Sequence, residues 1–129
     1  MKQAHVTGLL AALLVFDVVL SVTAFFFPQL WFDIFHGVNY VDPQGFLYRC
    51  AANWTAFALF QAVALIRWKR ESWWLLIVAG VRFSDIFTDL TYYFVATDTT
   101  WFAFNLLLMG PVNFALGLLL VRMWKRFRS

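Results

Sequence analysis

The chain has 129 residues, of which 63% are hydrophobic and only 13% are charged. Soluble domains carry about 25% charged residues, so this composition excludes an ordinary soluble protein and predicts an integral membrane protein. The formal net charge is +3. Because the basic residues gather beside the apolar stretches, membrane topology accounts for them, and we expect no nucleic-acid partner.

The apolar residues fall into four stretches, at residues 5–27, 46–68, 73–96 and 101–124. At a rise of about 1.5 Å per residue, each stretch is long enough as a helix to cross a hydrocarbon core of about 30 Å. Few residues remain outside these stretches. The sequence therefore predicts an all-α membrane protein, in which residues 1–129 form a single domain of four transmembrane helices in an antiparallel bundle.

The connection after the first stretch is the only long one. Residues 29–36 (QLWFDIFH) follow Pro28 and alternate bulky apolar side chains with Asp33 and His36. This pattern predicts a short amphipathic helix in the membrane interface. Asp33 and His36 are three residues apart, so both could face the mouth of a pocket, although a solvated polar face is the simpler explanation for them. The sequence DPQG at residues 42–45 predicts a turn before the second transmembrane helix.

Lysine and arginine outside the apolar interiors lie on one side of the expected membrane. They are Lys2, Arg67, Lys69, Arg70, Arg122, Lys125, Arg126 and Arg128. The two connections on the other side, residues 28–45 and 97–100, contain neither residue type. By the positive-inside rule we expect both termini to be cytoplasmic, in a protein of the cell or inner membrane.

Charged residues also lie within the apolar stretches. Arg82, Asp85 and Asp89 are spaced i, i+3 and i+7, which places them on one face of a helix. A charge at the centre of the bilayer costs about 3 kcal/mol, so these side chains should face the bundle interior and find partners there. Counting residues along the helices places Asp17 and Arg82 near the same depth, and we expect them to form an ion pair.

The polar groups inside the apolar stretches should form two layers. An inner layer contains Asp17, Arg82, Asp85 and Asn113, and an outer layer contains Arg49, Asn53, Asp89 and Asn105. These layers hold three carboxylates and two guanidinium groups, so one carboxylate, Asp85 or Asp89, lacks a full partner and should hold a proton or face water. Either the polar groups fix the register of the helices, or they line an outward-facing pocket for a ligand.

Several classes of chemistry are excluded by the residues present. Cys50 is the only cysteine, which excludes an internal disulfide and a Cys-x-x-Cys redox pair. Asp33 and His36 are too few ligands for a metal site, and His5 lies at the other end of the first stretch. We therefore expect no metal and no cofactor, and no motif assigns a catalytic role.

These features predict a small polytopic membrane protein that acts as a binding protein or an accessory subunit. Its pocket would take a lipid-like ligand or a partner helix, and its partners would be membrane lipids, a larger membrane complex or further copies of the chain. One alternative is an intramembrane enzyme that uses Asp85 and Asp89 as acid and base on a hydrophobic substrate, as in sterol isomerisation. A proton-linked carrier is the other. An open cavity with convergent polar groups would favour ligand binding or catalysis over helix packing alone.

Overall fold

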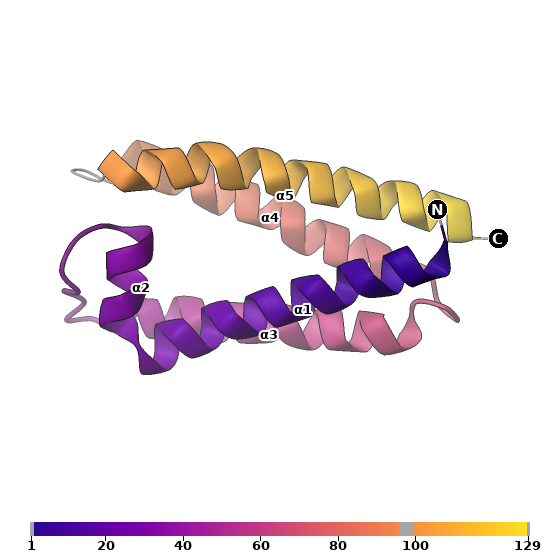
Figure 1. Cartoon of the computed structure of the whole chain (residues 1–129), viewed down its shortest axis with the longest axis horizontal. Coiled ribbons are helices and arrows are strands. Elements are labelled where there is room, and N and C mark those ends of the chain that lie inside the picture. The colour runs from indigo at the N-terminus through magenta and orange to yellow at the C-terminus, as the bar shows by residue number, and fades with distance from the viewer. Residues whose placement is uncertain (1, 96–99, 129) are drawn as a thin grey trace.

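Each apolar stretch forms one long helix in the computed structural model. The model describes residues 2–95 and 100–128, and side chains in these ranges except at 92–93 and 100–107. The helices are α1 (Gln3–Phe26), α2 (Pro28–Phe35), α3 (Phe46–Arg67), α4 (Trp74–Val95) and α5 (Thr100–Phe127) (Figure 1). No strand occurs in the described ranges. The predicted all-α class is confirmed.

The short helix α2 follows α1 directly and begins at Pro28, whose fixed φ suits the first helical position. Trp31 of α2 is buried, and its ring centroid lies 4.3 Å from that of Phe35 and 4.5 Å from that of Trp54 in α3. The predicted helix at residues 29–36 is therefore confirmed, and aromatic packing holds it against the end of α3. Its location in a membrane interface stays a prediction.

The predicted turn at residues 42–45 does lead into α3. The carboxylate of Asp42 accepts hydrogen bonds from the backbone N–H groups of Phe46 at 2.9 Å and Leu47 at 2.8 Å. Both groups lie in the first turn, where no helical carbonyl can accept them. Gly45 precedes the helix with a φ of 69°, a conformation that costs a glycine little.

The four long helices are arranged as two antiparallel pairs, α1 with α3 and α4 with α5 (Figure 1). At the end that holds both termini, one buried core joins all four. It comprises Val6, Leu10, Leu13, Ala64, Trp68, Leu75, Val78, Ala79, Leu120 and Met123. The core at the opposite end comprises Ala24, Trp31, Leu47 and Ala51, none of which belongs to α4 or α5. The pairs are thus joined at one end and separate toward the other.

Two helices, α1 and α3, are long and apolar enough to cross a membrane by length and composition. The helix α4 has 22 residues, as many as α3, but it contains Arg82, Asp85 and Asp89. The structure supports two candidate spans, and the complete four-span bundle is taken up below as a proposal.

Candidate functional site

A buried polar network joins α1, α3 and α4 near the middle of the molecule. Nη2 of Arg82 donates a hydrogen bond to Oδ2 of Asp17 at 2.6 Å. The two side chains are 2% and 1% exposed. The predicted ion pair is confirmed. At this degree of burial, loss of one member leaves the other charge without compensation, so the pair constrains how α4 sits against α1.

Gln61 of α3 is the third member of the network and was not among the predicted site residues. Its Nε2 donates a hydrogen bond to the same oxygen of Asp17 that Arg82 contacts. The side chain is completely buried. The available signal was a single amide in the apolar run at residues 56–66. Because Gln61 donates a hydrogen bond to Asp17, the network links α1, α3 and α4 at the point where their shared core ends.

Two buried polar atoms in this network have no hydrogen-bond partner among the described residues. They are the acceptor Oε1 of Gln61 and the donor Nε of Arg82. Most buried polar groups in native proteins are paired, so an unpaired donor and acceptor in one network form an unusual polar environment. The network can therefore accept further hydrogen-bonding groups without breaking its ion pair.

Asp85 lies beside this network but is incompletely paired. Its Oδ2 is 3.8 Å from Nη1 of Arg82, and its side chain is 21% exposed. The guanidinium group already holds Asp17 at 2.6 Å, so the second contact is the longer and the weaker of the two. Two carboxylates share one cation, and Asp85 is the one that reaches the surface. This matches the expectation that one carboxylate lacks a full partner.

Asp89 lies one helical turn beyond Asp85 on the same face of α4, and the two carboxylates repel each other. Asp89 is partly buried, and its carboxylate interacts with the side chain of Asn113 in α5. The sequence placed Asn113 in the inner layer with Asp17, whereas in the structure it is a partner of Asp89. The depth of Asn113 along α5 was the only guide to its layer, and depth does not determine which helix it faces.

The predicted outer layer does not form around Arg49. Arg49 and Asn53 are both exposed, and Arg49 makes no ion pair in the described part of the chain. The reason is helical geometry. Leu47 and Ala51 are buried, and residues two positions after each of them face the opposite side of α3. The side chain of Asn105, the fourth polar residue expected near this level, lies outside the described residues.

Asp33 and His36 contact different residues. Asp33 is exposed and accepts a hydrogen bond from Nε2 of Gln29 at 2.7 Å. The ring of His36 lies 4.6 Å from the ring of Phe32, measured between centroids. Burial lowers the pKa of His36 below its ordinary value of 6.5. A shared role for the two side chains at a pocket mouth stays a prediction.

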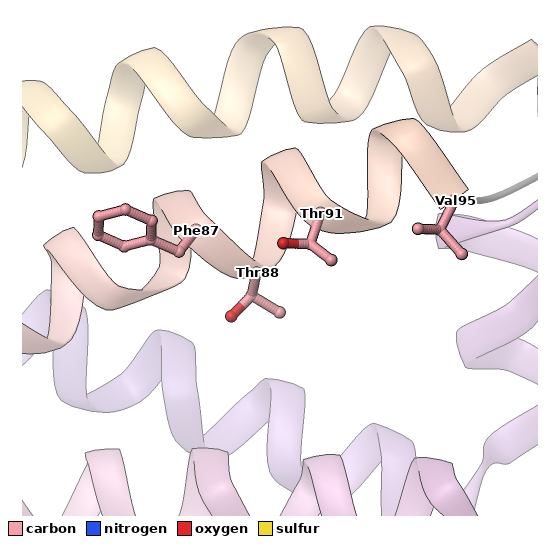
Figure 2. Close-up of a pocket in the computed structure, with 4 residues that line it drawn as sticks. All are labelled: Phe87, Thr88, Thr91 and Val95. Atoms are coloured by element: carbon pink, nitrogen blue, oxygen red, sulfur yellow. The ribbon is translucent and has the colours of Figure 1, made fainter.

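An open depression of about 480 Å³ lies along α4, beyond the buried network. Its lining residues among the described side chains are Phe87, Thr88, Thr91 and Val95, and all four belong to α4 (Figure 2). Asp85 precedes Thr88 by three residues, so the two side chains are neighbours on the surface of α4. The wall is mostly apolar, with two hydroxyl groups and a carboxylate at its border.

The residues at this site offer hydrogen-bonding groups and one surplus negative charge rather than a metal cage. Within the described ranges, no group of three or more His, Cys, Asp or Glu side chains could hold a metal ion. Comparison of the chain with protein-family models, curated proteins and solved structures gave no match. The functional argument therefore depends on the geometry of the chain itself.

Proposed function

We propose that the chain crosses a membrane four times with both termini in the cytoplasm, and that it is a non-enzymatic protein that binds a small apolar or amphipathic ligand in the depression along α4. The depression on α4, next to the incompletely paired Asp85, carries this proposal. The membrane location, the orientation and the binding role each have separate support.

Exposed apolar side chains support the membrane location. Val41, Ile66 and Phe94 are more than three-quarters exposed, and large apolar residues are exposed on all five helices. In water, contiguous apolar surface of this extent would promote aggregation. In a membrane the same apolar side chains contact lipid, which carries no cost in free energy. The charged side chains of the Asp17 network face the interior instead, as charges within a membrane do.

The distribution of basic residues supports the orientation. The N- and C-termini and the connection between α3 and α4 lie at the same end of the molecule (Figure 1). That end carries eight of the ten Lys and Arg residues, namely Lys2, Arg67, Lys69, Arg70, Arg122, Lys125, Arg126 and Arg128. Since basic segments are retained in the cytoplasm, this end is the cytoplasmic one.

The size of the depression favours a small ligand over a partner helix. Its lining runs from Phe87 to Val95, a little more than two helical turns. A partner helix that packed along α4 would need a groove that continued much further. A ligand that entered sideways from the bilayer would need only this opening.

The sterol-isomerase-like enzyme gains no comparable support. Paired acid–base catalysis would require the carboxylates of Asp85 and Asp89 to converge on one substrate atom. In the described residues Asp85 contacts Arg82, whereas Asp89 interacts with Asn113 of another helix. The enzyme and the proton-linked carrier stay alternative predictions.

Photolabelling tests the proposed site directly. The protein, reconstituted in lipid nanodiscs, is exposed to a diazirine-bearing dodecanol, and labelled peptides are identified by mass spectrometry. We expect saturable labelling within residues 83–95, with loss of this labelling in Thr91→Trp, because an indole there fills the depression. Leu90→Trp is the matched control, since Leu90 is an exposed neighbour that does not line the depression. Labelling spread evenly over all lipid-facing helices, and equal in both variants, would contradict the proposal.

A further inference from the structure

The polar interior of the bundle carries an excess of negative charge. The described side chains that face inward include the carboxylates of Asp17, Asp85 and Asp89 but only one cation, Arg82, because Arg49 is turned outward. The sequence alone suggested two cations for three carboxylates. In a medium of low dielectric constant an uncompensated charge is costly, so this region favours the arrival of a positive group.

The surplus charge is concentrated at the border of the depression. Arg82 is committed to Asp17 at 2.6 Å and reaches Asp85 only at 3.8 Å. Asp85 retains 21% exposure, so one carboxylate with spare acceptor capacity is accessible next to an apolar wall. A carboxylate oxygen accepts its strongest hydrogen bonds from cationic donors.

A hydroxyl group lies next to this carboxylate. Thr88, three residues after Asp85, lines the depression, and its Oγ1 donates a hydrogen bond to the carbonyl oxygen of Ser84 at 3.5 Å. Because the hydroxyl proton of Thr88 is used in this hydrogen bond, the lone pairs of Oγ1 are available to a ligand group that donates a hydrogen bond. Asp85 and Thr88 together present acceptors, which suits a group that has several N–H donors.

The network behind Asp85 is itself incompletely paired. Oε1 of Gln61 and Nε of Arg82 are buried and have no hydrogen-bond partner among the described residues. Both side chains are at least 98% buried, as their exposed fractions of 0% and 2% show. These unpaired atoms keep the interior next to Asp85 polar.

We propose that the ligand is a lipophilic amine, bound with its protonated nitrogen between the Asp85 carboxylate and the Thr88 hydroxyl, and with its apolar part against Phe87, Thr91 and Val95. This inference rests on the proposed function, because it names the chemical class of ligand for the same depression. The ammonium group compensates the surplus charge, and the apolar part leaves the depression sideways into the bilayer.

The test uses three competitors that share one alkyl chain and differ in head group: dodecylamine, dodecanol and dodecanoate. Each competes with the diazirine-bearing dodecanol for labelling of residues 83–95 in nanodiscs of neutral lipid at pH 7.5. We expect dodecylamine to compete about tenfold better than dodecanol, because a hydrogen bond to a charged group contributes roughly 1.5 to 3 kcal/mol. Dodecanoate should be the weakest competitor.

Variants separate the role of Asp85 from simple partitioning into the membrane, which is the same for every variant. The ratio of amine to alcohol competition should fall about tenfold in Asp85→Asn and recover in Asp85→Glu. Asp33→Asn is the matched control, because this exposed carboxylate lies on α2 and should leave the ratio unchanged. If Asp85→Asn does not fold, Thr88→Val replaces it, and its ratio should also fall.

Each outcome decides between the two proposals. Equal competition by amine and alcohol in the wild-type protein, or a ratio that Asp85→Asn and Thr88→Val leave unchanged, overturns the amine assignment and leaves the binding site standing. Preferential competition by dodecanoate would show that the Arg82 cation selects an anionic head group, and this result also overturns the amine assignment. Absence of saturable labelling would reject the proposed site, and the amine assignment with it.

Discussion

Asp17 and Asp85 are both acidic residues within apolar stretches, yet their surroundings give them different roles. Asp17 is fully buried and accepts hydrogen bonds from Gln61 and Arg82 through one oxygen. Asp85 is partly exposed and has one long contact with Arg82. The same substitution, aspartate to asparagine, should therefore affect stability at the first position and ligand binding at the second.

We expect Asp17→Asn to lower the free energy of unfolding by about 3 kcal/mol, since it leaves the buried guanidinium of Arg82 without a counter-charge. The double variant Asp17→Asn with Arg82→Gln should recover much of this loss. Asp85→Asn should change the unfolding free energy by less than about 1 kcal/mol, because it removes only a long and partly screened contact. Unfolding in mixed detergent micelles, followed by circular dichroism, compares these three variants with the wild-type protein and with the single variant Arg82→Gln, which completes the double-mutant cycle.

Additive losses in the double variant would show that Asp17 and Arg82 do not stabilise each other. A loss in Asp85→Asn as large as that in Asp17→Asn would show that Asp85 is part of the packing, and the interpretation of the polar groups as fixing helix register would then replace the ligand-binding one.

His36 should make the packing of α2 sensitive to pH. Burial holds the pKa of His36 below 6.5 in the folded protein, so the folded state binds fewer protons than the unfolded state in this range. Its contribution to stability is then complete above pH 6.5 and is lost as the pH falls through the folded pKa. We expect the fluorescence that reports the contact between Trp31 and Trp54 to change on acidification. His36→Phe keeps an aromatic ring against Phe32 but does not titrate, and its response should be flat.

The ion pair between Asp17 and Arg82 could be predicted because the rise per residue fixes the depth of each side chain along its helix. The partner of Asn113 and the outward direction of Arg49 could not be predicted in the same way. Both depend on how each helix is rotated about its own axis, and the packing of neighbouring helices determines that rotation. Gln61 was not predicted because its side chain is neutral, and a single amide in an apolar run does not by itself indicate a buried polar network.

At the scale of the helices, the ring of Phe83 in α4 packs against α5 at Gly117. A Cβ atom added there would lie 2.5 Å from Cε1 of Phe83, whereas one added at Gly110 on the same helix would meet nothing within 4 Å. The absence of a side chain at Gly117 therefore allows the ring of Phe83 to pack against α5.

We expect Gly117→Ala to destabilise the protein by about 1 to 3 kcal/mol, because the Phe83 ring must move out of a packed position. Gly110→Ala is the matched control and should be neutral, or stabilising by up to about 1 kcal/mol, since alanine favours a helix. Thermal unfolding of both variants provides the comparison. Equal midpoints for the two variants would show that the close approach at Gly117 contributes nothing to stability.

The number and limits of the helices follow closely from the apolar stretches, since α1, α3 and α4 begin and end within about two residues of the expected positions. The helix α5 is longer and continues to Phe127 through a basic segment that helix propensity favours. The separation of the two helix pairs could not be predicted. At the end where the pairs diverge, α2 packs with α1 and α3, and these contacts join segments that are distant in sequence.

At the scale of the whole molecule, the proposed orientation predicts which loops an external reagent reaches. In a Cys50→Ser background, we expect an impermeant maleimide added outside to label Val41→Cys and Asp98→Cys strongly and Lys69→Cys weakly, because the basic connection is cytoplasmic. Permeabilised cells serve as the control, in which Lys69→Cys should label fully. Labelling of Lys69→Cys alone in intact cells would reverse the orientation.

The central claim is that the depression along α4 holds a small amphipathic molecule in the native membrane. Native mass spectrometry of the protein, released gently from its own membrane, tests this claim most directly. We expect a small-molecule adduct on the wild-type protein and on Leu90→Trp that is absent from Thr91→Trp, in which the depression is filled. Identical adducts on all three proteins, or a protein subunit bound in place of a small molecule, would contradict the claim.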